Sequence, residues 1–204
     1  MTYTLYNSKG SGGMAVEAAL AKAGAQFTCV EVDTAKDAHK AADFLKLSPL
    51  GQVPVLTLPD GTLMTESAAM VIHIAHTFPD ANLAPRPGTP GHAVFLRWML
   101  FMACNLYEPD LRYFYAPRYT TDANGADGVK AAAVAYMAKS FAIIEAGLNP
   151  WLAAKTLGVA DVYLAMLTTW SPEPLASAKF KALRAAVAAD RAYGPVWEKH
   201  GLAV

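Results

Sequence analysis

Strand-like patterns are confined to the first 64 residues of this chain. Thr2–Asn7 and Gln26–Val32 alternate and are rich in Tyr, Thr and Val, which is typical of strands, and the helix-forming segment Met14–Ala23 lies between them. Gly24 follows that segment as a helix-ending residue. A strand, a helix and a second strand in this order predict a βαβ unit with parallel strands and a right-handed crossover.

The next segment continues the α/β pattern. A weakly helical stretch over Ala35–Leu47 precedes a strand at Val53–Leu58. The Asp-Gly pair of Pro59–Gly61 then predicts a hairpin turn to a short strand at Thr62–Met64, and a helix is expected over Thr65–Thr77. The predicted order is therefore βαβαββα.

The pattern changes at residues 80–91. Prolines 79, 85, 87 and 90, with two glycines, interrupt regular structure there. Beyond them we expect helices and no strand, at His92–Tyr115, Gly128–Ala146, Val159–Thr169 and Ala176–Ala189. The sequence predicts an α/β unit at 1–79, a linker at 80–91 and an all-α unit at 92–204.

Charge and cysteine content exclude several function classes. The 17 basic and 17 acidic residues cancel, so nothing general attracts nucleic acid or an anionic membrane. Cys29 and Cys104 form no CxxC, and the chain opens without a signal-like segment, which favours a reducing, cytoplasmic location. The pair His73 and His76 lacks neighbouring cysteine or carboxylate ligands, so we expect no metal site.

A proline at the start of the predicted third strand is the most informative feature. Pro54 follows a turn and cannot donate to a sheet. If the Val53–Pro54 bond is cis, the Val53 backbone turns outward and can pair with another peptide, as an added strand would. The alternative is a trans proline that only begins the strand, which proline statistics alone favour.

Glu66 and Ser67 lie where a strand gives way to a helix. The free N–H groups of a helix start and a serine hydroxyl suit a carboxylate, and Glu66 suits an ammonium group. The pair therefore fits the α-amino-acid end of a ligand. The alternative is helix capping alone, by Thr65 or Ser67.

The turn Ser8–Gly13, between the first strand and the first helix, aims backbone amides at whatever lies at the helix start. A thiolate there would be stabilised by the helix dipole and by a hydroxyl donor. Lowering a thiol pKa by two units needs only ~2.7 kcal/mol. The alternative is a flexible Gly/Ser turn with no chemical role.

These segments together resemble the N-terminal domain of the cytosolic glutathione transferases. The similarity lies in Leu5-Tyr6 with Ser8 and Ser11, in Ser48–Leu56 (SPLGQVPVL) and in Asp60–Met70 (DGTLMTESAAM). It implies a thioredoxin-like domain followed by a helical domain, with bacterial classes that use serine or cysteine, beta, theta or zeta-like, as the nearest. By resemblance, Val53 and cis Pro54 bind the cysteinyl backbone of glutathione, Glu66 and Ser67 bind its γ-glutamyl end, and Gln52 and Lys46 bind its glycyl end.

The catalytic turn departs from the family pattern. Aligned on Ala19-Leu20, Gly12 occupies the cysteine position, and Ser11 lies one residue before it. The resemblance makes Ser11 the candidate that stabilises the glutathione thiolate, with Ser8 or the backbone amides as alternatives. Tyr6 could resemble the tyrosine of other classes, but its neighbours fit that role poorly.

The C-terminal half resembles the family more loosely. Asp161, in GVADVYL, is expected to cap a buried helix at Gly158 rather than to act chemically. The aromatic-rich long helix is expected to supply the second-substrate pocket, with Trp98, Asn105 and Tyr107 as candidates, although most apolar residues at helical spacing are core. Because Asn105 and Tyr107 are two apart, only one of them is expected to point inward.

The resemblance implies a homodimeric enzyme that uses glutathione as cosubstrate and needs no other cofactor. It would activate the glutathione thiolate to attack a largely apolar small electrophile. The alternatives are a non-catalytic glutathione-binding or scaffold protein, which the Gly12-Gly13 pair favours, and a glutathione-dependent disulfide reductase.

Overall fold

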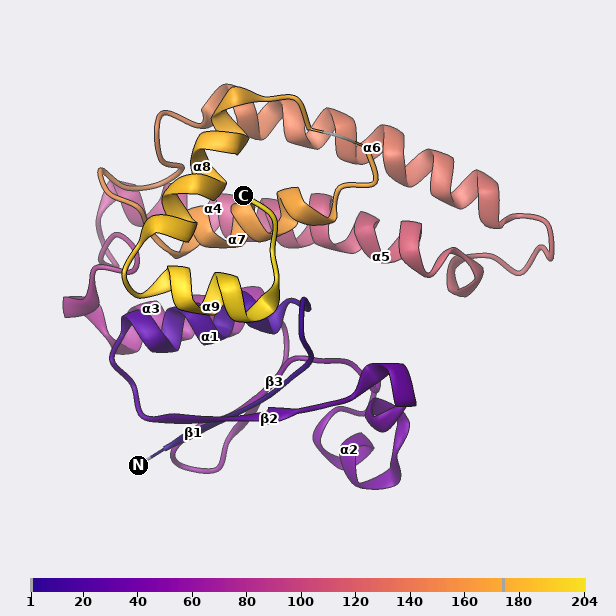
Figure 1. Ribbon diagram of the computed structural model, residues 1–204, viewed down its shortest axis with the longest axis horizontal. Helices are drawn as coiled ribbons and strands as arrows, with labels where there is room; N and C mark the ends of the chain where they lie inside the picture. The colour runs from indigo at the N-terminus through magenta and orange to yellow at the C-terminus, as the bar shows by residue number, and fades with distance from the viewer. Residues whose placement is uncertain (1, 174) are drawn as a thin grey trace.

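The computed structural model describes residues 2–173 and 175–204, and it combines a thioredoxin-like unit with an all-helical one (Figure 1). The four-stranded sheet has the order β2-β1-β3-β4. Its strands are β1 (Tyr3–Asn7), β2 (Phe27–Glu31), β3 (Val55–Thr57) and β4 (Leu63–Met64). β1 is parallel to β2 and antiparallel to β3, which is antiparallel to β4, as the predicted βαβ unit and hairpin require.

Helix α1 (Gly13–Lys22) is the centre of the molecule. It packs against α3 (Ser67–Thr77) and also against helices of the C-terminal unit, so it is covered on several sides (Figure 1). Met14, Val16 and Leu20 are completely buried. Burial all around explains why the helix is apolar almost throughout rather than on one face.

The weakly helical stretch at 35–47 is not one helix. It forms two short 3₁₀ turns, Thr34–Lys36 and Ala38–Lys40, and then α2 (Ala42–Leu47). Asp37, between the turns, adopts a left-handed conformation with φ of 57°, which no continuous helix can contain. The expected helix over 35–47 is therefore wrong in its first half.

The C-terminal unit is all-helical, as predicted, but its longest element is broken. The expected helix His92–Tyr115 consists of α4, a π-helical segment at Ala103–Tyr107, and α5. A helix after residue 190 was not predicted. The helices are α4 (Pro90–Met102), α5 (Glu108–Phe114), α6 (Ala126–Gly147), α7 (Val159–Trp170), α8 (Ala178–Ala189) and α9 (Tyr193–His200).

Both units share one continuous hydrophobic core, which runs from Leu5 in β1 to Trp197 in α9. Helix α4 begins at Pro90, inside the expected linker at 80–91. The unit boundaries at 1–79 and 92–204 stay a prediction. In the described part of the chain, no helix is long and apolar enough to cross a membrane.

Asp161 has the structural role expected of it. Its carboxylate accepts hydrogen bonds from the backbone N–H of Gly158 and of Leu152, both at 2.9 Å. Burial raises its pKa to about 6 although these bonds act in the opposite direction. The carboxylate thus satisfies the amide at the N-cap of the buried helix α7 and one amide of the preceding loop, which glycine has no side chain to do.

Candidate functional site

A large cleft of about 1440 Å³ lies where the two units meet. The N-terminal unit contributes the turn after β1, the segment around Pro54 and the start of α3, and the C-terminal unit contributes α4, the π-helical segment and α5. The cleft therefore gathers the three segments singled out from the sequence. Its size exceeds that of a typical small-molecule pocket, so it has room for two ligands.

The Val53–Pro54 peptide bond is cis, as predicted. Strand β3 begins only at Val55, so Val53 lies outside the sheet, on the cleft. Among the described residues, none forms a backbone hydrogen bond with Val53. Its N–H and C=O groups are thus available to an extended peptide ligand.

Glu66 and Ser67 also lie on the cleft, at the start of α3. Glu66 is exposed and has a φ of 67°, a conformation that is strained for a residue with a side chain and that tends to persist at functional sites. The buried Ser67 hydroxyl lies 2.9 Å from the hydroxyl of Tyr163 on α7. Burial raises the pKa of Tyr163, so its phenol stays protonated and can donate to Ser67. The Ser67 proton is then free for a ligand carboxylate.

The expected contacts to the glycyl end are only partly in place. Gln52 lines the cleft, but Lys46 does not: it is exposed on α2, and its ammonium pairs with Asp43 at 2.7 Å. Two residues that sequence reasoning missed, His39 and Lys40, line the cleft instead. The Nδ1 atom of His39 is buried and has no hydrogen-bond partner among the described residues, so it is free to bond to a ligand.

Both candidate serines line the cleft, yet their hydroxyls already have protein partners. Ser11 Oγ donates to Asn7 Oδ1 at 2.6 Å. Ser8 Oγ lies 3.2 Å from Thr34 Oγ1. The catalytic role of Ser11 therefore stays a prediction, and a role in shaping the turn is equally consistent with its hydrogen bond.

A buried network from the end of the chain holds this turn. The Gly10 N–H donates to His200 Nδ1 at 3.0 Å, and His200 Nε2 lies 3.0 Å from Glu17 Oε2 on α1. Burial raises the pKa of Glu17, but hydrogen bonds from His200 and Lys199 outweigh it and the pKa is lowered. Because the partners are more than 180 positions apart, no local pattern could have indicated this network.

Tyr107, like His200, reaches the turn Ser8–Gly13 from the C-terminal unit. An ideal Cβ placed on Gly12 would overlap the Tyr107 hydroxyl and would lie 2.7 Å from ring carbon Cε2. Burial raises the pKa of Tyr107 to about 12, the charge of Glu66 adds to this effect, and the hydrogen-bonding Gly12 amide opposes it. A π-helical segment inserts a residue and thereby shifts the face that a side chain presents, which is how Tyr107 comes to lie here.

The other two second-substrate candidates lie away from the cleft. Trp98 is buried between α4 and the end of α6. Its ring meets the Phe101 ring edge-on, with the ring centroids 5.6 Å apart. The side-chain amide of Asn105 donates a hydrogen bond to the Phe101 carbonyl and accepts one from the hydroxyl of Tyr136 on α6. Of Asn105 and Tyr107, only Tyr107 lines the cleft, as their spacing of two residues led us to expect, and Trp98 is part of the core instead.

Asp110 on α5 is a further cleft residue that sequence reasoning missed. Its side chain is only 2% exposed, and neither carboxylate oxygen has a hydrogen-bond partner among the described residues. Burial raises its pKa to about 7. A buried carboxyl without a partner is costly when ionised, so it titrates near neutral pH.

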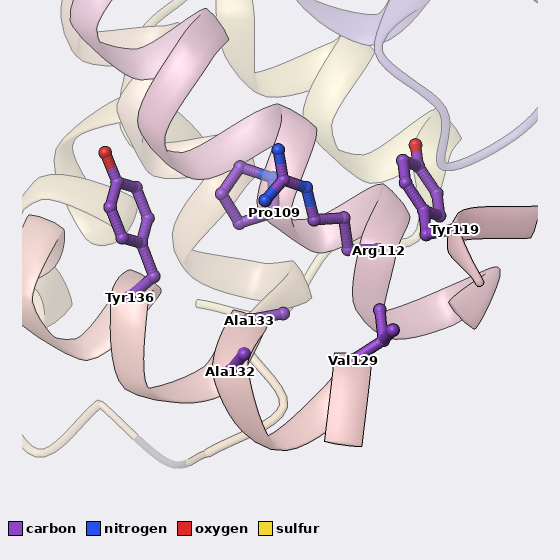
Figure 2. A pocket seen from close by; sticks show the side chains of 7 residues that line it. All are labelled: Pro109, Arg112, Tyr119, Val129, Ala132, Ala133 and Tyr136. Atoms are coloured by element: carbon purple, nitrogen blue, oxygen red, sulfur yellow. The ribbon is translucent and has the colours of Figure 1, made fainter. Parts of the chain in front are cut away.

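Part of the cleft wall in the C-terminal unit is apolar and open to solvent, beside the charged residues Glu108, Arg112 and Arg118. Leu100, Phe114 and Tyr115 line it and are 58%, 56% and 44% exposed. Exposed apolar side chains gathered at a cleft mark a binding surface. A separate hollow of about 300 Å³ lies between α5 and α6, where Figure 2 shows Pro109 and Arg112 facing Ala132 and Ala133, with the Tyr119 and Tyr136 rings on either side. It does not include the catalytic turn.

Comparisons with known proteins agree with this geometry. Residues 1–76 match the family described as glutathione S-transferase, N-terminal domain. The chain is 26% identical over 170 residues to glutathione S-transferase GstA of Escherichia coli O157:H7, covering 82% of this chain and 81% of that protein.

Two solved structures extend the similarity to the whole chain. A glutathione transferase homologue from Sulfitobacter with bound glutathione superposes with a TM-score of 0.89 over 99% of both chains at 24% identity, a likeness of fold. A sphingomonad glutathione S-transferase complexed with glutathione reaches a TM-score of 0.82 at 28% identity, over 98% of this chain and 100% of the other.

Proposed function

We propose that this chain is a glutathione transferase, which binds glutathione in the cleft and transfers it to a small, largely apolar electrophile. The single observation that carries this proposal is the cleft itself: a free peptide backbone at Val53, an acid–serine pair at the start of α3 and an apolar wall meet around one turn. A tripeptide thiol and an apolar partner fit these surfaces together.

Each part of glutathione has a matching group in the proposed arrangement. The γ-glutamyl end carries an ammonium for Glu66 and a carboxylate for the amide and hydroxyl of Ser67. The cysteinyl backbone pairs with Val53 beside Pro54. The glycyl carboxylate lies toward Gln52, His39 and Lys40, which line the cleft, and Lys46 has no part in it.

The cysteinyl sulfur then lies near the turn Ser8–Gly12, beside the start of α1. Amides and a hydroxyl at this point favour the thiolate over the thiol. The thiolate attacks the electrophile held against Leu100, Phe114 and Tyr115, and the proton released from sulfur passes to solvent. Ser11 is the candidate of the N-terminal unit for the hydroxyl, since it lies on the cleft next to Gly12.

A conjugation assay tests this proposal. The purified protein is first retained on immobilised glutathione and eluted with free glutathione, and then assayed spectrophotometrically with an activated aryl halide. We expect retention and glutathione-dependent turnover. No retention and no binding by calorimetry would refute the proposal.

A non-catalytic glutathione-binding protein is the second candidate. One observation favours it: the hydroxyls of Ser8 and Ser11 both have protein partners, and Gly12 has no side chain to contribute. This candidate predicts retention on immobilised glutathione, a bound thiol that titrates as it does in free glutathione, and no turnover with any of several electrophile classes.

We further propose a cytoplasmic homodimer with two-fold symmetry, since most soluble homo-oligomers of this kind are C₂. Light scattering at micromolar concentration should give twice the chain mass of 21.7 kDa. A monomeric mass would reject the dimer without affecting the proposed glutathione site, which lies within one chain.

A further inference from the structure

We propose that Tyr107, on the C-terminal helices, is the catalytic residue that donates a hydrogen bond to the sulfur of bound glutathione. This inference rests on the proposed transferase function and assigns its thiolate-stabilising group. It replaces a donor from the N-terminal turn, such as Ser11, by one that reaches the turn from the other unit.

The first argument is the position of the phenol. Gly12 opens α1, and the space that a side chain at Gly12 would fill is occupied by the Tyr107 hydroxyl and ring. A residue with a side chain at this position could offer its own donor to the sulfur. Here the glycine leaves room for a donor that comes from residue 107.

The second argument is the availability of the proton. The Tyr107 hydroxyl lies against Gly12, and the Gly12 amide acts to lower the Tyr107 pKa against the effect of burial, so the phenolic oxygen faces the turn. Among the described residues, no side chain accepts the Tyr107 proton, whereas the Ser11 proton is donated to Asn7. The phenolic proton is therefore free to point into the cleft.

The third argument is the protonation state. Because burial raises the Tyr107 pKa to about 12, the phenol keeps its proton at neutral pH. A neutral donor next to a sulfur atom stabilises the thiolate relative to the thiol and so lowers the thiol pKa.

The fourth argument is rigidity. The Tyr107 ring stacks on Tyr163 with centroids 6.4 Å apart and meets Trp170 edge-on at 5.3 Å. Tyr163 in turn contacts Ser67 at the proposed γ-glutamyl site. Aromatic packing of this kind holds the hydroxyl in one place, so its hydrogen bond needs little reorganisation in the reaction.

The thiol proton of bound glutathione is lost to solvent, and the Tyr107 O–H donates to the sulfur anion without transferring its proton. The sulfur electron pair forms the C–S bond, and the leaving group of the electrophile departs with the electrons of its own bond. Tyr107 is unchanged at the end of the turnover.

The test is a titration of the bound thiol, followed by its thiolate ultraviolet absorbance, in the wild type, in Tyr107→Phe and in Ser11→Ala. The Phe variant keeps the ring and loses only the hydroxyl. We expect its bound-thiol pKa to rise by about one unit, which lowers the thiolate fraction and the kcat at neutral pH by about tenfold, with recovery at higher pH. Glutathione affinity should stay within about twofold, because a donor that serves the charged sulfur adds little to binding.

Tyr136→Phe is the matched control, because its hydroxyl bonds to Asn105 outside the cleft. It should leave the bound-thiol pKa and kcat unchanged. An unchanged pKa in Tyr107→Phe, or a shift seen only in Ser11→Ala, would overturn the inference. Loss of glutathione binding in Tyr107→Phe would assign the hydroxyl to ground-state binding and would also overturn it. Failure of the proposed function would give a different result from failure of this inference, since the wild type itself would then bind no glutathione.

Discussion

Replacing Gly12 by alanine probes the contact between the two units most sharply. Gly12 has φ of −59° and ψ of −15°, which any L-residue adopts without strain. In the absence of neighbours, a change from glycine to alanine here would stabilise the protein by about 0.4–1 kcal/mol, because it restricts the unfolded chain. The added Cβ instead meets the Tyr107 ring and hydroxyl.

The cost of that collision can be bounded. Overpacking a rigid site costs about 1–3 kcal/mol, so Gly12→Ala should be net destabilising by about 0–2.5 kcal/mol in the wild-type background. In a Tyr107→Ala background the collision is absent, and only the gain of about 0.4–1 kcal/mol remains. The double-mutant cycle should therefore show a coupling energy of about 1–3 kcal/mol.

Urea unfolding of the four proteins measures this coupling, provided that the slopes of the transitions agree. Gly10→Ala is the matched control: its φ of 73° makes alanine costly, but its Cβ would meet nothing within 4 Å. Its cost should be the same with Tyr107 or Ala at position 107. A Gly12→Ala variant that is equally destabilised in both backgrounds would refute the contact between the turn and Tyr107.

Asp110→Asn should stabilise the protein relative to the wild type, and this gain should grow between about pH 4 and pH 7. In the wild type the native pKa of Asp110 is raised to about 7, so ionising Asp110 above its unfolded pKa costs folding free energy, whereas asparagine does not ionise. A difference of about three pKa units between the native and unfolded states corresponds to at most about 4 kcal/mol. Chemical unfolding across this pH range measures the gain in stability, and a gain that does not depend on pH would contradict the prediction. Lys40→Ala should weaken glutathione binding about two- to fivefold, because Lys40 lines the cleft and an exposed charge contact contributes at most about 1 kcal/mol. Lys46→Ala should leave binding unchanged, because Lys46 does not line the cleft and pairs with Asp43. Calorimetry on both variants checks this, and equal effects would place the glycyl end elsewhere.

The glutathione-side features could be predicted because their signals are local. The turn before Pro54, the Asp-Gly hairpin and the acid–serine pair each lie within a few consecutive residues, and they fix β3, β4 and the start of α3. The same holds for Asp161, whose capping bonds stay within ten residues.

The C-terminal contribution could be predicted only in part, because its signals are not local. Tyr107 was a candidate, but the apolar spacing does not indicate the π-helical segment at Ala103–Tyr107 on which it lies. Likewise, Lys40 and Lys46 both lie in the weakly helical stretch, and the sequence pattern does not distinguish Lys40, which lines the cleft, from Lys46, which does not. His200 supports the turn from the far end of the chain.

Calorimetric titration of the wild type and of Glu66→Ala with glutathione, and with glutathione acetylated on its α-amine, tests the central claim most directly. The account predicts saturable binding of glutathione to the wild type and a loss of roughly 1–3 kcal/mol in Glu66→Ala, about 5- to 150-fold in affinity. Acetylation, which removes the ammonium, should weaken binding to the wild type by a similar factor and should cost little more in Glu66→Ala. Equal glutathione affinity in the two proteins would contradict the placement of the γ-glutamyl end at Glu66 and Ser67.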